Sequence, residues 1–120
     1  MNKPDHRSAS RAEESTLDPA ATLFRSLSDV TRLTIVRRLA IGEARVIDLV
    51  QEIGLAQSTV SAHIACLRDC GLVVGRPQGR QIFYSLACSK LVDLLASAEL
   101  VLEATGNAIF LCPTYRPKSS

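Results

Sequence analysis

Two short amphipathic helix patterns, separated by only a few residues, constrain the fold of this chain more than any other feature of its sequence. Apolar residues recur at helical spacing from Val46 to Ile53 and predict a helix that Gly54 ends. A second helix is predicted over Gln57–Cys70. Its inward stripe consists of Val60, Ile64 and Leu67. Two helices joined by so short a glycine-containing turn are typical of a helix-turn-helix.

The outward face of the second helix carries small and polar side chains. At about 100° per residue, the side opposite the apolar stripe centres on Ser58, Ala62, Ala65 and Asp69, with the small and polar side chains near its N-terminal end. A helix that only meets solvent usually carries Glu and Lys there. Small polar side chains instead let a backbone approach a DNA groove and hydrogen-bond to phosphates or base edges. This face therefore predicts a recognition helix, with an ordinary solvated face as the alternative.

A β-hairpin is predicted directly after the recognition helix. Strand-forming residues cover Leu72–Gly75 and Gln81–Leu86, and proline and glycine predict a hairpin tip over Arg76–Arg80. Two arginines on a hairpin beside a recognition helix form a wing that can lie along the DNA backbone. Charged hairpin tips are also common in proteins that do not bind DNA.

Further helices are predicted before this motif. Asp18 followed by Pro19 predicts a helix start, because an aspartate caps the helix and proline needs no hydrogen bond at its first position. Ser28 and Asp29 predict the cap of the next helix, which Gly42 ends. The buried face of that helix is expected to contain Leu33, Val36, Leu39 and Ala40.

A long apolar helix is predicted over Lys90–Thr105, with Ser89 as its cap. Its apolar stripe consists of Leu91, Leu94, Leu95, Ala98, Val101 and Leu102. So small a domain has too little core to cover this stripe by itself. A homodimer interface is therefore the expected partner of this helix.

Length and composition limit the chain to one small globular domain. It has 120 residues, of which 47% are hydrophobic and 22% are charged. We expect a flexible N-terminal tail over 1–17, a folded domain over 18–105 and a C-terminal tail over 106–120. The predicted fold class is mainly α with a small β-hairpin, which is a dimeric winged helix-turn-helix.

The sequence also limits where the protein works. No stretch approaches the roughly 18 consecutive apolar residues of a membrane span, and residues 1–16 lack the apolar segment of a secretion signal. We therefore expect a cytoplasmic protein with no membrane partner. There its four cysteines are expected to remain thiols. An enzyme is not expected, because neither an acid–base partner nor a phosphate-binding glycine loop accompanies these cysteines.

Several short runs carry a family resemblance over roughly residues 20–104. They are the runs 27–33 (LSDVTRL), 58–67 (STVSAHIACL), 71–73 (GLV), 79–80 (GR) and 84–86 (YSL). With them the chain resembles the ArsR/SmtB family of bacterial metal-responsive repressors. It departs from the family at Val30, where proline is usual.

The resemblance implies a dimeric repressor that binds a palindromic operator without inducer and releases it with inducer. Matched by position, the DNA contacts implied on the recognition helix are Gln57, Ser58, Thr59, Ser61 and His63. The wing would add Arg80 and Arg76. For His63, a hydrogen bond within the helix scaffold is the alternative.

The cysteines indicate where an inducer would bind. Family members with other sites use Cys-x-Cys at the third helix or Asp and His on the last helix, and this chain lacks the first motif and has no His on its last helix. Cys66 and Cys70 lie one turn apart, within reach of one ion. This pair resembles the CmtR-like, cadmium- and lead-sensing branch of the family. In that branch a third thiolate comes from the C-terminal region of the other protomer, which implies Cys112 here.

Three thiolates form a soft site that suits Cd²⁺ or Pb²⁺, with As(III) or Sb(III) as alternatives. Other interpretations remain open at this point. The pair at Cys66 and Cys70 could be packing residues, or it could sense oxidants through a disulfide. Cys112 could simply dock an apolar tail, and Cys88 is interpreted as a bystander.

Overall fold

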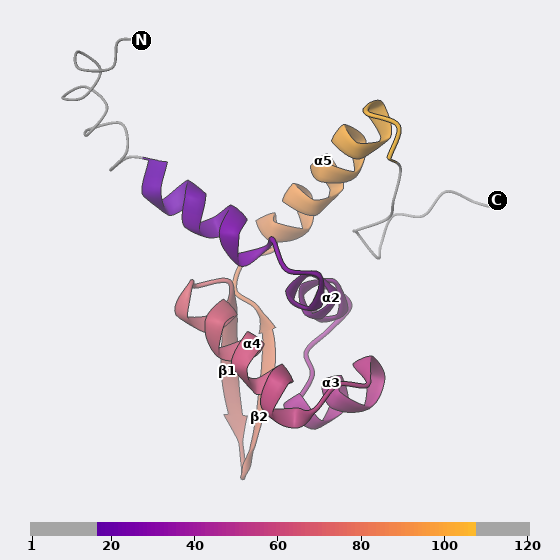
Figure 1. Cartoon of the computed structure of the whole chain (residues 1–120). Coiled ribbons are helices and arrows are strands. Elements are labelled where there is room, and N and C mark those ends of the chain that lie inside the picture. The colour runs from indigo at the N-terminus through magenta and orange to yellow at the C-terminus, as the bar shows by residue number, and fades with distance from the viewer. Residues whose placement is uncertain (1–16, 108–120) are drawn as a thin grey trace.

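Residues 17–107 form a series of helices interrupted by one β-hairpin in the computed structural model of the chain (Figure 1). The elements are a helix over 17–26, here called the N-terminal helix, α2 (Val30–Leu39), α3 (Val46–Ile53), α4 (Gln57–Asp69), β1 (Val73–Gln78), β2 (Gln81–Leu86) and α5 (Lys90–Ala104). The predicted tails fall almost entirely outside these residues. No helix within 17–107 is long and apolar enough to cross a membrane.

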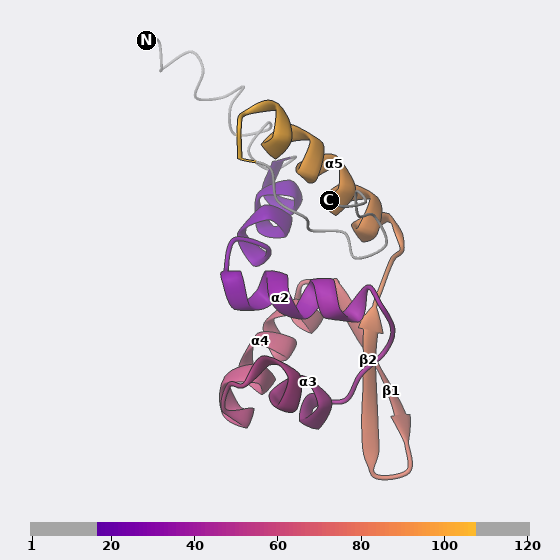
Figure 2. The ribbon, with the colours of Figure 1, turned by 90° about the vertical axis from the view of Figure 1, so that its right-hand side faces the viewer.

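The elements divide into a base and two arms. Helices α2, α3 and α4 pack with the hairpin, while the N-terminal helix and α5 rise from this base and diverge (Figure 1). Turned by 90°, the hairpin projects beyond the helices as a long, narrow wing (Figure 2). The arrangement is the predicted winged helix-turn-helix.

The helix-turn-helix ends where its local chemistry predicts. Both α3 and α4 begin at the predicted residues, and Gly54 ends α3 in the left-handed conformation, with φ of 85°. That conformation favours glycine because it has no Cβ. At the start of α2, Asp29 accepts the backbone N–H of Arg32 at 3.0 Å, as the sequence predicts.

Two predicted caps are wrong. Leu17 is already helical, so Asp18 does not cap the N-terminal helix; proline is compatible with the whole first turn, so Pro19 does not fix the start. Ser89 occupies the N-cap of α5, but its own dihedrals are helical and its side chain makes no capping bond. A capping hydroxyl needs the extended backbone of a usual N-cap. Instead, Cys88 Sγ accepts the N–H of Lys90 at 3.4 Å.

The wing is longer than predicted. The sequence ends the first strand at Gly75, whereas β1 continues to Gln78, which pairs with Gln81. The loop is therefore only Gly79 and Arg80, and the φ of 65° at Gly79 matches the first position of a type II′ turn. Pro77 is tolerated in the strand because it lies one step from the loop-closing pair, where the N–H points away from the partner strand.

One core joins the base to the arms. Ile35, Leu49 and Leu67 are completely buried, and they come from α2, α3 and α4 respectively. The wing and α5 contribute Val73, Tyr84, Leu91 and Leu95. Ile35 was not on the predicted inward stripe of α2, whereas two residues of that stripe, Leu33 and Ala40, are only half-buried. The buried arc differs because α2 packs against both α4 and β2.

A short backbone bridge fixes the wing to the helix-turn-helix. Ala44, in the loop before α3, donates its N–H to the Tyr84 carbonyl at 3.0 Å and accepts the Tyr84 N–H at 2.8 Å. Ala44 is also buried. The loop thereby adds one pair of ladder hydrogen bonds to the edge of β2, so the wing cannot pivot freely relative to α3.

Truncating Ile35 to alanine should destabilise the fold by about 2–5 kcal/mol, because it removes a completely buried side chain and leaves a cavity. Val30, on the same helix, is 80% exposed, so its replacement by alanine should change stability by less than about 0.5 kcal/mol. Urea unfolding of both variants measures the difference. Equal effects of the two substitutions would contradict the described core.

Candidate nucleic-acid interface and thiol pair

The beginning of α4 is the most exposed part of the helix-turn-helix. Gln57, Ser58 and Thr59 are exposed, and Ser61 is half-buried one turn further on. Ala56 stands at the N-cap and offers no side-chain acceptor to the first-turn N–H groups. Free N–H groups and hydroxyls at a helix N-terminus attract anions such as phosphate. The structure therefore brings four of the five predicted contacts on this helix to one accessible end.

His63 lies apart from this exposed end and faces α2. Its side chain is only 21% exposed, and Arg32 Nη1 lies 3.4 Å from its Nδ1. Its Nε2 lies 3.9 Å from a carboxylate oxygen of Asp29. Since a guanidinium can only donate, Nδ1 acts as the acceptor in this contact. This geometry favours the scaffold interpretation of His63 over a direct DNA contact.

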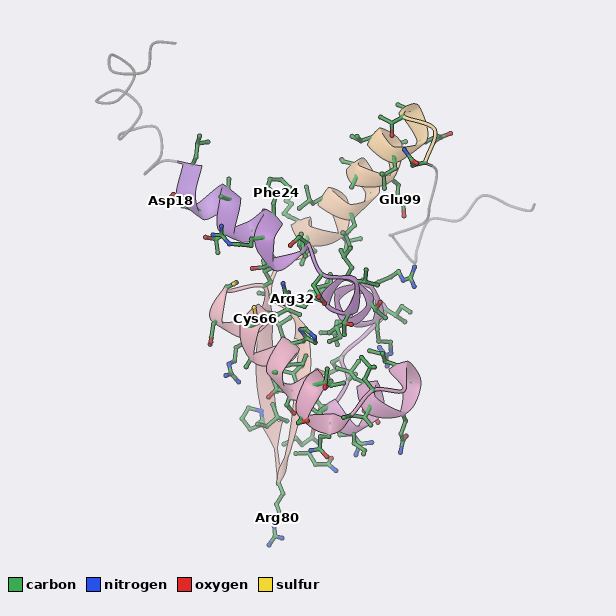
Figure 3. The ribbon with its side chains drawn as sticks, viewed as in Figure 1. Asp18, Phe24, Arg32, Cys66, Arg80 and Glu99 are labelled. Atoms are coloured by element: carbon green, nitrogen blue, oxygen red, sulfur yellow. The ribbon has the colours of Figure 1, made fainter. Side chains whose placement is uncertain are left out.

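The two arginines of the wing differ in their surroundings. Arg80 projects from the hairpin tip into solvent (Figure 3), and no hydrogen bond or ion pair of its guanidinium is present within residues 17–107. Arg76 forms an ion pair with Glu43, donates to Gln78 at 2.8 Å and stacks over Phe83, with 5.1 Å to the ring centroid. Its hydrogen bond lowers the pKa of Glu43. Arg76 thus braces the wing, whereas Arg80 is free to meet a phosphate.

A hollow of about 320 Å³ separates the wing from the helix-turn-helix. Arg45 and Arg80 contribute positive charge to its lining, and Gln57 contributes the first residue of α4. Sequence reasoning missed Arg45. Its guanidinium donates to both carboxylate oxygens of Asp48, at 2.7 and 3.0 Å, and its backbone N–H donates to the same carboxylate at 2.9 Å. The sequence pattern that could have identified it is a basic residue at the N-cap of α3, Arg45, three positions before Asp48.

Cys66 and Cys70 are free thiols at the end of α4, and both are half-buried. Cys70 follows the last helical residue and still donates its backbone N–H to the Cys66 carbonyl at 3.1 Å. The one-turn spacing of the helix therefore extends to the second thiol. Two soft sulfur donors at this spacing suit a thiophilic ion.

The third predicted ligand, Cys112, lies outside the described residues. Within residues 17–107 no three or more Cys, His, Asp or Glu side chains gather as a metal site. Cys88 is exposed and separate from the pair, at the start of α5. A complete site of three thiolates would thus need a ligand from beyond residue 107 or from a second chain.

The predicted dimer stripe of α5 is divided between two environments. Leu91 and Leu95 belong to the core of their own chain. Leu94, Ala98 and Leu102 are half-buried, while Val101 is 63% exposed. The neighbouring Leu100 is 62% exposed, and Phe24 of the N-terminal helix is 58% exposed and projects toward α5 (Figure 3). The unburied apolar surface therefore spans both arms. Leu100 was missed because it lies off the predicted stripe of α5, and Phe24 because the predicted dimer interface was confined to α5.

Comparison with known proteins points to one family. Residues 29–74 match the family of bacterial regulatory proteins described as the arsR family. The transcriptional regulator CmtR of Mycobacterium tuberculosis is 43% identical over 84 residues, which cover 70% of this chain and 71% of that protein. A probable mercury resistance operon repressor of Streptomyces lividans is 34% identical over 95 residues, covering 79% and 76% of the two chains.

Solved structures agree with the sequence comparison. A homodimeric winged helix-turn-helix DNA-binding domain of Mycobacterium bovis superposes with a TM-score of 0.70 at 30% identity, covering 76% of this chain and 84% of that one. The solution structure of CmtR from M. tuberculosis, described as a cadmium metal-sensor, gives a TM-score of 0.60 at 37% identity and covers 83% and 97%.

The pairing of Asp48 with Arg45 makes stability depend on pH in the acid range. Hydrogen bonds from the Arg45 side chain and then its backbone N–H lower the pKa of Asp48 from its ordinary value of 3.8 to about 2. Because the pKa is lower in the folded state, this pairing stabilises the fold at neutral pH and is lost as the pH falls from about 4 toward 2.

Asp48→Asn should therefore lower the melting temperature at pH 6 and reduce its further fall between pH 4 and pH 2. Thermal unfolding across this range measures both effects. The control is Asp69→Asn, because Asp69 only approaches Arg68 at 3.9 Å on the surface. A wild-type pH dependence in Asp48→Asn would show that the pair does not contribute.

Proposed function

Because this chain belongs to the ArsR family of bacterial regulatory proteins, we propose that it is a dimeric repressor that releases operator DNA when a thiophilic metal ion binds to its recognition helix. It is a DNA-binding transcriptional regulator and not an enzyme. The observation that carries the metal proposal is the placement of two free thiols, Cys66 and Cys70, at one end of the helix whose other end exposes the residues proposed to contact DNA. The proposed site of action is the cytoplasm.

Operator binding is proposed to use the exposed end of α4 and the wing tip. Ser58, Thr59 and Gln57 would approach a major groove, with Ser61 behind them, while Arg80 would contact a backbone phosphate. Arg76 and His63 would act mainly by holding the wing and α4 in place, since both have protein partners.

Dimerisation is proposed to bury the apolar surface of the two arms. The exposed side chains of Phe24, Leu100 and Val101 would lie at its centre, with Leu94, Ala98 and Leu102 beside them. The homodimeric state of the M. bovis domain supports this proposal. A two-fold symmetric dimer would read a palindromic operator, one half-site per protomer.

The proposed inducer site combines Cys66 and Cys70 with Cys112 from the C-terminal tail, residues 106–120. The descriptions of CmtR as a cadmium metal-sensor and of the S. lividans relative as a mercury resistance operon repressor support a soft ion. Cd²⁺ or Pb²⁺ is proposed first, and As(III) or Sb(III) is the alternative, because all of them prefer thiolates. Binding such an ion supplies sulfur–metal bonds and displaces the thiol protons.

Release of DNA requires that the ion binds the DNA-free conformation more tightly than the DNA-bound one. Cys66 and Cys70 flank the last buried residue of the α4 stripe, Leu67, at the end of the helix that carries the proposed DNA contacts. A change in the position of the last turn therefore moves or rotates the whole recognition helix. Because α4 is short, this movement would shift its exposed N-terminal end away from the position that fits the major groove of DNA.

Arg80→Ala should weaken operator binding and reduce the dependence of log K on log salt concentration by about one unit, because it removes one phosphate contact. Fluorescence anisotropy with operator DNA at several salt concentrations measures both quantities. Lys90→Ala is the charge-matched control, since Lys90 is exposed at the start of α5, away from the wing tip. A salt dependence in Arg80→Ala equal to that of Lys90→Ala would exclude Arg80 as a phosphate contact.

Cys66→Ser and Cys70→Ser should retain operator binding and lose metal-dependent release, because each removes a soft ligand. In the unaltered protein, adding Cd²⁺ under anaerobic conditions should weaken binding by about 5–150-fold. Cys112→Ser is expected to lose release as well, whereas Cys88→Ser should retain it. Release that survives in Cys66→Ser and Cys70→Ser would refute the site.

Anaerobic titrations with Cd²⁺, Pb²⁺ and As(III) would rank the inducers. Thiolate-to-metal charge-transfer absorption should appear with each ion that binds, and it should weaken in all three proposed ligand variants. If none of these ions produced the absorption, while mild oxidation released the operator, the cysteines would sense oxidants instead.

A further inference from the structure

A continuous set of hydrogen bonds joins Cys70 to His63 through two other elements. The Ser26 hydroxyl of the N-terminal helix lies 2.8 Å from Cys70 Sγ. The carbonyl of Ser26 accepts a hydrogen bond from Arg32 Nε at 2.6 Å, and Arg32 Nη1 contacts His63 Nδ1 at 3.4 Å. The path leaves α4 at its C-terminal end, passes through the N-terminal helix and α2, and returns to the middle of α4.

We propose that Ser26 is a positioning residue. It transmits the binding of a metal ion at Cys70 to the recognition helix and to the N-terminal helix. This inference rests on the proposed function, because it describes how a metal ion at Cys70 would be coupled to DNA binding. Ser26 is suited to this role because it is 4% exposed, so water does not compete for its hydroxyl.

The Ser26 hydroxyl has one proton but two close partners. It lies 2.8 Å from the Thr22 carbonyl, as well as 2.8 Å from Cys70 Sγ. A carbonyl can only accept, so the contact with Thr22 uses the hydroxyl proton. When Cys70 is a thiol, its S–H can donate to Ser26 Oγ while the hydroxyl donates to Thr22. Both contacts are then satisfied at the same time.

This arrangement depends on the thiol proton, which Cys70 would give up to solvent if it held a metal ion. The Cys70 sulfur would then be an acceptor only. The hydroxyl must then turn from Thr22 to the sulfur, or the contact between Ser26 and Cys70 is lost. The first outcome changes the last turn of the N-terminal helix, because the serine bond to the carbonyl four residues earlier is part of that turn. The second outcome releases this turn from the C-terminal end of α4.

Arg32 extends the change to His63. Its guanidinium binds two successive carbonyls at the end of the N-terminal helix, Ser26 at 2.6 Å and Arg25 at 3.3 Å. The backbone N–H of Arg32 is held by Asp29, whose carboxylate also faces His63. A shift of the last turn therefore moves the group that contacts the recognition helix. The N-terminal helix also carries Phe24 of the proposed dimer surface, so the change reaches this arm of the molecule as well.

The first experiment uses the metal-free protein and the imidazole ¹⁵N signals of its two histidines, His6 and His63. Cys70→Ala should shift the His63 signals, and Ser26→Ala should shift them as well. The decisive comparison is the double variant, in which Cys70→Ala should add little to Ser26→Ala, because the path is already broken. Cys88→Ala should leave both histidines unchanged. Fully additive shifts, or no shift at all, would overturn the proposal.

The second experiment measures operator affinity with and without Cd²⁺. Ser26→Ala should bind Cd²⁺ with the same charge-transfer absorption as the unaltered protein, yet its metal-dependent loss of affinity should shrink to less than about fivefold, below the usual range of allosteric coupling. Ser26→Thr keeps the hydroxyl and should restore the coupling. Ser28→Ala is the matched control, because that exposed hydroxyl only donates to the Arg25 carbonyl at 2.7 Å.

The outcomes separate this inference from the proposed function. If the unaltered protein binds DNA but does not release it with any thiophilic ion, the proposed function fails, while the imidazole shifts still test the path. If the unaltered protein releases DNA and Ser26→Ala releases it equally, the role of Ser26 is refuted and metal sensing stands. Circular dichroism melting of each variant confirms that it is folded, and if Ser26→Thr does not fold, Ser26→Cys supplies an alternative donor.

Discussion

The burial of one stripe of α4 is the constraint on which the other features depend. Val60, Ile64 and Leu67 are buried against α2, α3 and the wing, and each contributes roughly 1.5–3 kcal/mol by leaving water. These contacts fix the rotation of the helix about its axis. Once that rotation is fixed, residues 57–59 must face solvent, and Cys66 and Cys70 must lie half-buried at the edge of the core, where Cys70 contacts Ser26 of the N-terminal helix.

Polar contacts, rather than the core, place the wing. The backbone bridge between Ala44 and Tyr84 and the ion pair between Arg76 and Glu43 both tie the hairpin to the loop before α3. An exposed ion pair contributes little to stability by itself. Here the ion pair helps to fix the orientation of the hairpin. Because Glu43 is paired with Arg76, Arg80 at the tip has no competing partner in the described part of the chain.

One helix thus combines the proposed reading of DNA with the proposed sensing of an ion. Because both proposed roles belong to one helix, the thiols do not need a long pathway to influence the exposed end of that helix. The contacts of Ser26 and Arg32 add a second route, which connects the same thiol to the arm that carries Phe24. A dimer built on these arms would couple the two protomers through this route.

The sequence by itself determined the elements that depend on local patterns. Helical periodicity and Gly54 defined α3 and the start of α4, strand-forming residues defined β2, and the outward small residues of α4 predicted a recognition helix. These features follow from the 3.6-residue period of helices, from the strand preference of β-branched and aromatic residues and from glycine's access to positive φ, all of which are properties of short segments. The family resemblance rested on the same segments, and the comparisons confirmed it.

Only the tertiary structure decided which side chains meet. Nothing in the local sequence indicates that Ser26 contacts Cys70, which lies 44 residues away. Nor does it indicate that Glu43 neutralises Arg76, while Arg80 has no such partner in the described part of the chain. The same holds for α2, whose burial on two sides made Ile35 a core residue, and for α5, whose stripe is shared between the core and an exposed arm. Periodicity shows that a face is apolar, but only the packing of distant elements determines which partner covers it and which side chains remain free.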